Sequence, residues 1–274
     1  MKLFKETKLT FITPAFLAGA DQNSPEIRVP SIRGELRWWF RVLGGTRNQE
    51  ISIFGGVHDG ATASKVVLRV ISRNLMQGQE IRMSPNTTKS YLYYFAQVSG
   101  NKVGVHRTEA GHYVAVGSEF ALSISLRVEL ASEERALLEK AVAAFLKLGA
   151  LGLRATRGCG AFTDDDQMSK DEFLSFSQTL GPSVFVGLAT RDLYSSGDKC
   201  QLALGSFLQN LRGDNHLSSK KRSALGFSEC RVRESSALRL RPVKVAEGYL
   251  PVVVYTDAAC DQSSLLDLVK SACI

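Results

Sequence analysis

Polar and apolar residues alternate with a period of two in several parts of the chain, which predicts β-strands. The clearest case is 119–130, where Phe120, Leu122 and Ile124 begin a run of alternate apolar positions. Segments rich in β-branched and aromatic residues predict further strands at 2–12, 65–72, 183–190, 237–245 and 249–255. The apolar run 51–54 fits either a small strand or the end of a helix.

Apolar residues three to four positions apart predict helices in other segments. Pro30 ends the preceding segment, and Ser31 is expected to cap a helix that buries Ile32, Leu36, Trp39, Phe40 and Leu43. Glu35 is expected in the first turn of that helix, where the helix dipole favours negative charge. Ser132 is expected to cap a second helix over 132–148, and further helices are predicted at 169–180, 202–211 and 263–273.

The helix that follows Pro30 carries a basic stripe, which consists of Arg33, Arg37 and Arg41 at intervals of four residues. The stripe lies beside the apolar face, and Trp38 is expected to point away from both. Gly34 has no side chain, so another backbone could approach closely there. The stripe either contacts an anionic partner or is solvated and paired with acidic side chains, and the helix alone leaves both interpretations open.

A glycine-rich loop follows the second helix and contains Arg154, Arg157, Gly158 and Gly160 within residues 149–162. Glycines allow successive backbone N–H groups to converge on an anion, and arginines add forked donors. The loop is not a P-loop, because no Gly-Lys-Ser/Thr follows, and it is not a dinucleotide fingerprint, because it follows a helix. A flexible helix-to-strand connection is the alternative interpretation.

The order of the elements predicts an α+β fold. Up to residue 163 the order fits a βαββαβ ferredoxin-like unit with an insertion at 57–117 that shows no sustained periodicity. We expect a second, degenerate ferredoxin-like domain over 164–274, which begins at an acidic triplet, 164–166, interpreted as a solvated linker. The fold class expected is therefore two ferredoxin-like (RRM-like) domains with insertions.

Composition narrows the class of protein further. No apolar run is long enough to cross a bilayer and no signal-peptide core begins the chain, so a cytoplasmic location is expected. The five cysteines are scattered, which predicts neither a disulfide framework nor a metal site. The net charge of +7 is only moderately basic, so the position of the charge matters, and 212–244 is notably basic.

Three motifs resemble the RAMP superfamily, and within it the head subunit of the Cmr-type (type III-B) CRISPR–Cas effector complex. They are TPAFLAGADQ at 13–22, PSIRGELRWWFR at 30–41 and GLRATRGCGAF at 152–162. Two further segments, IFGG at 53–56 and SSALRLRPVKV at 235–245, fit the family more loosely. Residues 57–120 depart from the pattern.

The resemblance implies two RRM-like domains and a non-catalytic subunit of a ribonucleoprotein that carries CRISPR RNA. The head subunit of that family lies toward the 3′ end of the guide and helps engage target single-stranded RNA, while another subunit cuts RNA. The implied partners are CRISPR RNA, target RNA and other RAMP subunits, without a membrane, a metal or a cofactor. A guide-binding subunit should contact phosphates and 2′-hydroxyls regardless of sequence.

On these grounds we expect RNA contacts from both basic motifs and from part of the basic C-terminal stretch. The expected residues are Arg33, Arg37, Arg41, Trp38, Arg154, Arg157, Gly158, Gly160, Arg231 and Arg233, with 220–222 and the loop 19–23 as weaker candidates.

Two alternatives share this fold. A RAMP endoribonuclease would need a general acid and base, usually with a histidine near the first strand, loop and helix. The four histidines, His58, His106, His112 and His216, all lie outside that region. A backbone subunit of the same complex type is the other alternative, and the TPAFLAGADQ opening argues against it.

Overall fold

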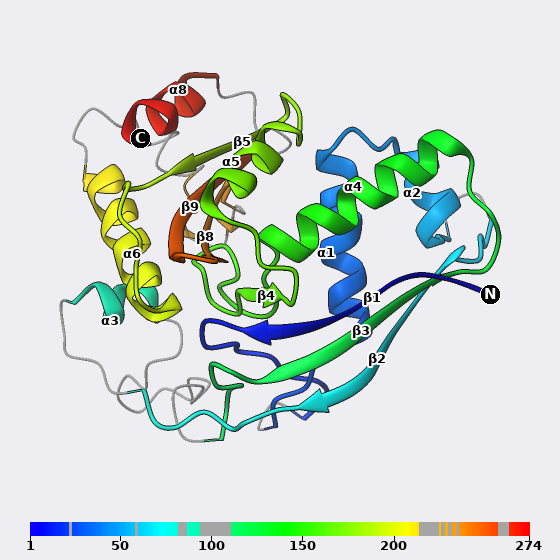
Figure 1. The fold of residues 1–274 in the computed structure, drawn as a ribbon, viewed down its shortest axis with the longest axis horizontal. Helices are drawn as coiled ribbons and strands as arrows, with labels where there is room; N and C mark the ends of the chain where they lie inside the picture. Colours follow the sequence, from blue (N-terminus) through cyan, green and yellow to red (C-terminus); the bar gives the residue numbers. More distant parts are fainter. Residues whose placement is uncertain are drawn as a thin grey trace.

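The fold is seen in a computed structural model, which describes residues 1–21, 24–57, 60–81, 87–93, 111–213, 225, 228–229, 232–233, 236–256 and 263–274, with the backbone alone at 228–229, 232–233 and 263–264. Two larger antiparallel sheets, one short two-stranded sheet and the helices make up the regular structure of the described part of the chain (Figure 1). None of the helices in these ranges is long and apolar enough to span a bilayer.

The first sheet has the strand order of a ferredoxin-like unit. It contains β1 (Lys2–Phe11), β2 (Val66–Asn74), β3 (Glu119–Leu126) and β4 (Phe162–Asp164) in the order β2-β3-β1-β4. All three pairings are antiparallel. Helix α1 (Val29–Val42) joins β1 to β2, and α4 (Ser132–Leu148) joins β3 to β4, and both helices lie over one face of the sheet (Figure 1). The predicted βαββαβ unit is therefore confirmed.

The second sheet contains three strands, β5 (Val184–Leu188), β8 (Leu238–Val245) and β9 (Gly248–Thr256), in the order β5-β9-β8. Helix α6 (Gly197–Gly213) follows β5, and α8 (Ser263–Ala272) follows β9. This is the order of the first, third and second strands of a ferredoxin-like unit. The α+β fold with two ferredoxin-like units thus agrees with the prediction, and the boundary between residues 163 and 164 remains a prediction.

The remaining elements are short. Helix α2 (Arg47–Phe54) begins with a capping box between Thr46 and Gln49, so the apolar run 51–54 is helical. Helix α3 (Thr88–Leu92) lies in the predicted insertion, and α5 (Lys170–Gln178) precedes β5 with a capping box between Ser169 and Glu172. A two-residue ladder joins β6 (Ser228–Glu229) to β7 (Val232–Arg233).

Two predicted helix caps are wrong. Helix α1 begins at Val29 with Arg28 as its N-cap, and no side chain caps it. Proline suits the first turn of a helix, because its fixed φ is helical and its missing N–H would have no partner there. Ser31 therefore lies inside the helix, and Glu35 lies beyond its first turn. Ser132 likewise lies inside α4, whose N-cap is Ala131.

The acidic triplet 164–166 is not simply a solvated linker. Asp164 ends β4 and is 5% exposed. The Lys147 ammonium donates a hydrogen bond to the Asp164 carboxylate at 2.8 Å. Burial raises the pKa of Asp164, and the hydrogen bond from Lys147 opposes that shift. This ion pair ties the end of α4 to β4.

One apolar cluster runs through both units. Trp39 and Phe40 of α1 pack in the same cluster as Phe145 of α4 and as Val252 and Val254 of β9. The second unit has its own smaller cluster, between α6 and the outer face of its sheet, which includes Leu204, Leu208 and Leu240. The two units therefore share a core at their junction.

Candidate nucleic-acid interface

Three segments that are distant in sequence line one groove. They are residues 16–18 of the opening loop, the first half of α1 at Ser31, Gly34 and Glu35, and residues 151–153 of the glycine-rich loop. Glu26 completes the lining, and the groove encloses 390 Å³. The structure therefore brings together the three motifs on which the family resemblance rests.

Backbone hydrogen bonds hold the opening loop against the glycine-rich loop. The Gly160 N–H donates to the Pro14 carbonyl at 2.8 Å, and the Leu153 N–H donates to the Phe16 carbonyl at 2.9 Å. The Thr13 hydroxyl donates to the Gly158 carbonyl at 2.7 Å and accepts from the Ala161 N–H at 2.9 Å. Thr13 is fully buried, so both bonds are shielded from water.

The glycines of the loop are required by its shape. Gly160 has a φ of 65°, and a Cβ there would lie 1.9 Å from the Leu151 carbonyl oxygen. Gly152 has a φ of 96°, and a Cβ there would lie 2.5 Å from the Phe16 carbonyl oxygen. Gly158 and Gly160 are buried, and their N–H groups donate to Ala155 and Pro14. The exposed part of the loop is Gly152 and Leu153.

The two arginines of the loop differ in exposure. Arg157 is 4% exposed, and its guanidinium donates to the Leu225 carbonyl and to the Ser236 hydroxyl. Burial, with Arg212 nearby, lowers the pKa of Arg157 to about 10. Arg154 is half-buried with a φ of 58°, and burial lowers its pKa as well. Arg157 therefore joins the loop to the second unit.

The basic stripe of α1 has partners within the chain. Arg37 and Arg41 both bond to one Glu50 carboxylate oxygen, at 2.5 Å and 2.7 Å. Arg33 donates to the Ser64 hydroxyl at 2.8 Å and to the Phe54 carbonyl at 3.2 Å. The paired alternative therefore holds for Arg37 and Arg41, and the stripe ties α1 to α2. Their side chains remain 34% and 48% exposed.

Trp38, which was predicted to point away from both the apolar face and the basic stripe of α1, packs against the second unit. The Arg239 guanidinium lies 3.3 Å from the centroid of the Trp38 ring. Trp39 contacts the Trp38 ring edge-on, with the centroids 4.8 Å apart. The half-buried Trp38 thus contributes to the junction of the two units, since α1 belongs to the first unit and β8 to the second.

Sequence reasoning missed the role of two arginines on β8. Arg239 donates to the Glu35 carboxylate at 2.9 Å, next to the groove. Arg241 is 1% exposed and donates to the Leu148 carbonyl at 2.6 Å and to the Ala155 carbonyl. A signal was present, because Val243 and Val245 follow on the same face of the strand, and that apolar face indicates a buried one.

Several other predicted residues cannot be placed. Arg231, residues 220–222 and residues 22–23 of the opening loop lie outside the described ranges, and for Arg233 only the backbone is described, in β7. Of the four histidines only His112 is described, and it is half-buried. Among the described residues, no group of three or more His, Cys, Asp or Glu side chains could hold a metal ion.

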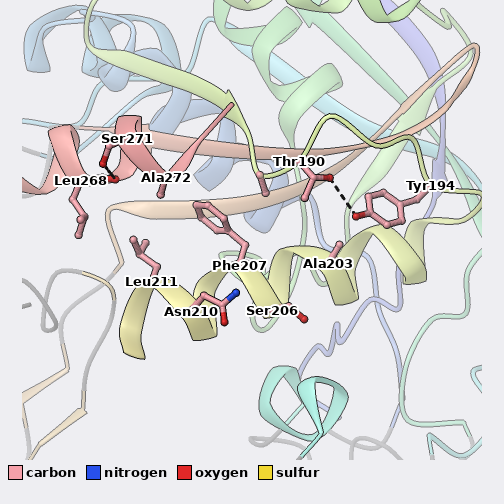
Figure 2. A pocket seen from close by; sticks show the side chains of 11 residues that line it. Thr190, Tyr194, Ala203, Ser206, Phe207, Asn210, Leu211, Leu268, Ser271 and Ala272 are labelled. Carbon is pink, nitrogen blue, oxygen red and sulfur yellow. Dashed lines mark hydrogen bonds between the residues drawn. The ribbon is translucent and has the colours of Figure 1, made fainter. Parts of the chain in front are cut away.

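The groove that the three motifs line is smaller than another cavity in the protein. A larger cavity of 620 Å³ lies in the second unit between α6 and α8 (Figure 2). Phe207 and Leu211 line it from α6, and the Thr190 and Tyr194 hydroxyls lie 3.3 Å apart at its other end. None of the three sequence motifs contributes to this lining.

A family model matches the part of the chain that contains all three motifs. The RAMP superfamily model matches residues 8–163. The CRISPR system Cmr subunit Cmr1-2 of Pyrococcus furiosus is 30% identical over 177 residues, which cover 56% of this chain and 90% of that protein. Cmr1-1 of the same organism is 28% identical over 149 residues, which cover 50% of this chain and 40% of that protein.

Solved structures share the fold over nearly the whole chain. The crystal structure of apo Cmr1 from Pyrococcus furiosus has a TM-score of 0.59 at 20% identity and covers 98% of this chain and 96% of that one. A chain of the type III-B Cmr-beta complex bound to cognate target RNA has a TM-score of 0.60 at 11% identity, with full coverage of both chains. Because the family model matches residues 8–163 and Cmr1-2 is 30% identical over most of its own length, the chain belongs to the RAMP superfamily, and within it the chain is Cmr1-like.

Proposed function

We propose that this chain is a non-catalytic RNA-binding subunit of a type III-B CRISPR effector complex. It lies toward the 3′ end of the CRISPR RNA and helps capture target single-stranded RNA. Its partners are those RNAs and the other RAMP subunits of the complex. The named relatives support the assembly, because both are Cmr subunits of CRISPR systems. A chain with the same fold belongs to a Cmr-beta complex whose structure contains cognate target RNA.

The observation that carries the proposal is the convergence of the three motifs on one groove. Gly34 leaves one position in the wall of the groove without a side chain, and a Cβ there would have no neighbour within 4 Å. A nucleic-acid backbone can approach such positions closely. The N-terminal turn of α1 lies in the same wall without a side-chain cap, so its dipole favours a phosphate there.

The charges of the groove favour ribose contacts beside the phosphate. Glu35 pairs with Arg239, which offsets its repulsion of a phosphate. Glu26 is exposed and can accept a hydrogen bond from a 2′-hydroxyl. Arg33, Arg37, Arg41 and Arg154 remain candidates for phosphate contacts around the groove, each alongside its partners within the chain.

A pair of substitutions at Gly34 tests the groove. Gly34→Glu and Gly34→Lys both place a long side chain in open space, so they should fold alike. Glu should weaken binding of single-stranded RNA about tenfold or more, because it repels phosphate, whereas Lys should retain or strengthen binding. The assay uses the chain assembled with its co-expressed neighbouring subunits and guide RNA, titrated with target RNA at several salt concentrations. Equal affinities for both variants and the parent would contradict the groove assignment.

The absence of catalysis is tested on the purified chain. We expect no discrete cleavage when repeat RNA is incubated with it in EDTA, since the proposal gives the chain a binding role alone. Discrete, site-specific products that persist in EDTA would favour a metal-independent endoribonuclease instead.

A further inference from the structure

In the described part of the chain, β5 is an edge strand of the second sheet. In the first unit β4 pairs with the equivalent strand, β1, from Leu9↔Asp164 to Phe11↔Phe162. In the second unit the described strands end at β5, which pairs with β9 alone. In the first unit, β4 occupies the fourth strand position of the ferredoxin-like sheet, beside β1. In the second unit, no described strand occupies the equivalent position beside β5.

The ladder shows which backbone groups face this edge. The Ala189 N–H donates to the Pro251 carbonyl of β9 at 2.9 Å. Because alternate residues of an edge strand bond to the same neighbour, Val184, Val186 and Leu188 direct their groups outward. The Ile274 N–H already donates to the Leu188 carbonyl at 2.9 Å, and the Val184 N–H donates to the Gly181 carbonyl. Within the described part of the chain, both backbone groups of Val186 have no partner.

A hollow of 190 Å³ lies beside the same edge. Val184, Phe185 and Tyr255 line it from the sheet, Leu266 and Lys270 line it from α8, and Pro182 and Ser183 complete it. In the first unit the corresponding space beneath the second helix is filled by Phe162 of β4, whose ring centroid lies 5.1 Å from that of Phe145 of α4. The hollow is therefore where an apolar side chain of a fourth strand would pack.

We infer that the outer edge of β5 receives an extended segment of another protein subunit as an added antiparallel strand. The segment bonds to the N–H and C=O of Val186 and places an apolar side chain against Phe185 and Leu266. An acidic residue at its end would face Lys270 on the rim of the hollow. Alternating backbone donors and acceptors beside an apolar hollow suit a peptide rather than an RNA. The inference rests on the proposed function in one respect, that the chain works within a multisubunit assembly.

A matched pair of substitutions at Val186 provides the test. Val186→Pro removes the outward N–H without breaking a bond to β9, which is how edge strands tolerate proline. Val186→Thr keeps the N–H and the β-branched shape. Leu266→Trp is a second variant, which fills the hollow from α8 and leaves β5 intact. Each variant is co-expressed with the neighbouring subunits and guide RNA, and subunit affinity and amide hydrogen exchange at 184–188 are measured in the free chain and in the assembly.

We expect the assembly to protect the Val186 amide in the parent chain and in Val186→Thr. Val186→Pro and Leu266→Trp should weaken incorporation about tenfold or more, while their own RNA affinity, measured on the isolated chain, stays unchanged. Full incorporation of both variants, or a Val186 amide that exchanges equally fast in the free chain and in the assembly, would overturn the inference and leave the RNA role standing. If the two variants lost self-association of the chain but kept normal incorporation, the occupant of the edge would be a second copy of this chain. That result would also overturn the inference. Conversely, Gly34→Glu should impair RNA binding and leave incorporation intact, so the two proposals fail separately.

Discussion

The guanidinium of Arg239 stacks on the indole of Trp38 at 3.3 Å. The same guanidinium donates to Glu35, one turn earlier on α1, at 2.9 Å. One side chain of the second unit therefore contacts two residues, about one turn apart, on the same side of the helix that lines the groove. This contact makes the position of α1 depend on both halves of the chain.

Replacement of Arg239 should loosen this junction. Arg239→Gln is expected to lower the free energy of unfolding by about 2–4 kcal/mol, because it removes a stacked cation and a charge-assisted hydrogen bond. Arg239→Lys keeps the charge but loses the planar stacking surface, so its effect should be intermediate. Urea unfolding of the purified variants measures both. Substitutions at ordinary surface positions change the free energy of unfolding by about 0.5 kcal/mol or less. A decrease within that range in Arg239→Gln would contradict this account.

The pairing of Glu50 should stabilise the contact between α1 and α2. Glu50 is 4% exposed and faces both Arg37 and Arg41. Glu50→Gln is expected to cost about 1–3 kcal/mol, since a neutral amide oxygen can accept both hydrogen bonds but without the attraction of the carboxylate charge. The same variant releases both arginines, so RNA affinity should rise if they contact RNA. Thermal unfolding measures the loss of stability, and an RNA titration of the same preparation measures the change in affinity. Arg37→Gln is the matched control, because it breaks the same ion pair but removes one of the arginines.

The Thr13 hydroxyl should matter more than its methyl group. Thr13→Val keeps the shape but leaves the Gly158 carbonyl and the Ala161 N–H without their buried partner. The expected cost is about 2–6 kcal/mol, at about 1–3 kcal/mol for each of the two unsatisfied groups. Thr13→Ser retains the hydroxyl and should lose less. Denaturant unfolding compares the three proteins, and equal stability of the Val and Ser variants would show that the hydroxyl is dispensable.

Stability should fall in alkaline solution because of Tyr93. Burial raises the pKa of Tyr93 well above its ordinary value, although a hydrogen bond to Gln201 at 2.7 Å opposes the shift. The unfolded chain releases the Tyr93 proton above about pH 10, while the folded chain retains it. The free energy of unfolding is therefore unaffected by Tyr93 ionisation below about pH 10. Above that pH it declines, by at most about 1.4 kcal/mol per pH unit for one proton.

Tyr93→Phe should make that decline shallower. The variant should also lose about 1 kcal/mol near neutral pH, because Gln201 loses a donor. Unfolding by urea at a series of pH values gives the slope for each protein. Parallel slopes for the parent and the variant would assign the alkaline sensitivity to other groups.

The sequence predicted the elements of the fold because their periodicity is a local property of each segment. The alternation in β3 and the apolar face of α1 are visible without knowledge of the rest of the chain. The roles of arginines could not be predicted in this way. Arg37 points to Glu50 across a loop, and Arg239 reaches Glu35 from a strand 204 residues away. Such pairings depend on how the units pack, which the spacing of residues along one helix does not encode.

The site was partly predictable for the same reason. The three motifs were evident from their residues, but their convergence on one groove required the fold. The buried positions of Gly158 and Gly160 reverse the simplest interpretation of a glycine-rich loop. Gly160 allows the loop to pass close to Leu151 and Pro14. The N–H groups of Gly158 and Gly160 donate to carbonyls within the protein and do not face solvent.

The apolar cluster that joins Trp39 of α1 to Val252 and Val254 of β9 has a consequence for how RNA would be received. Hinge motion between the halves would expose this cluster to water, so the contact of Arg239 with Glu35 at the groove is set when the chain folds. A preorganised receptor of this kind loses little conformational entropy on binding. Its affinity for a guide would then depend mainly on the ordering of the RNA strand.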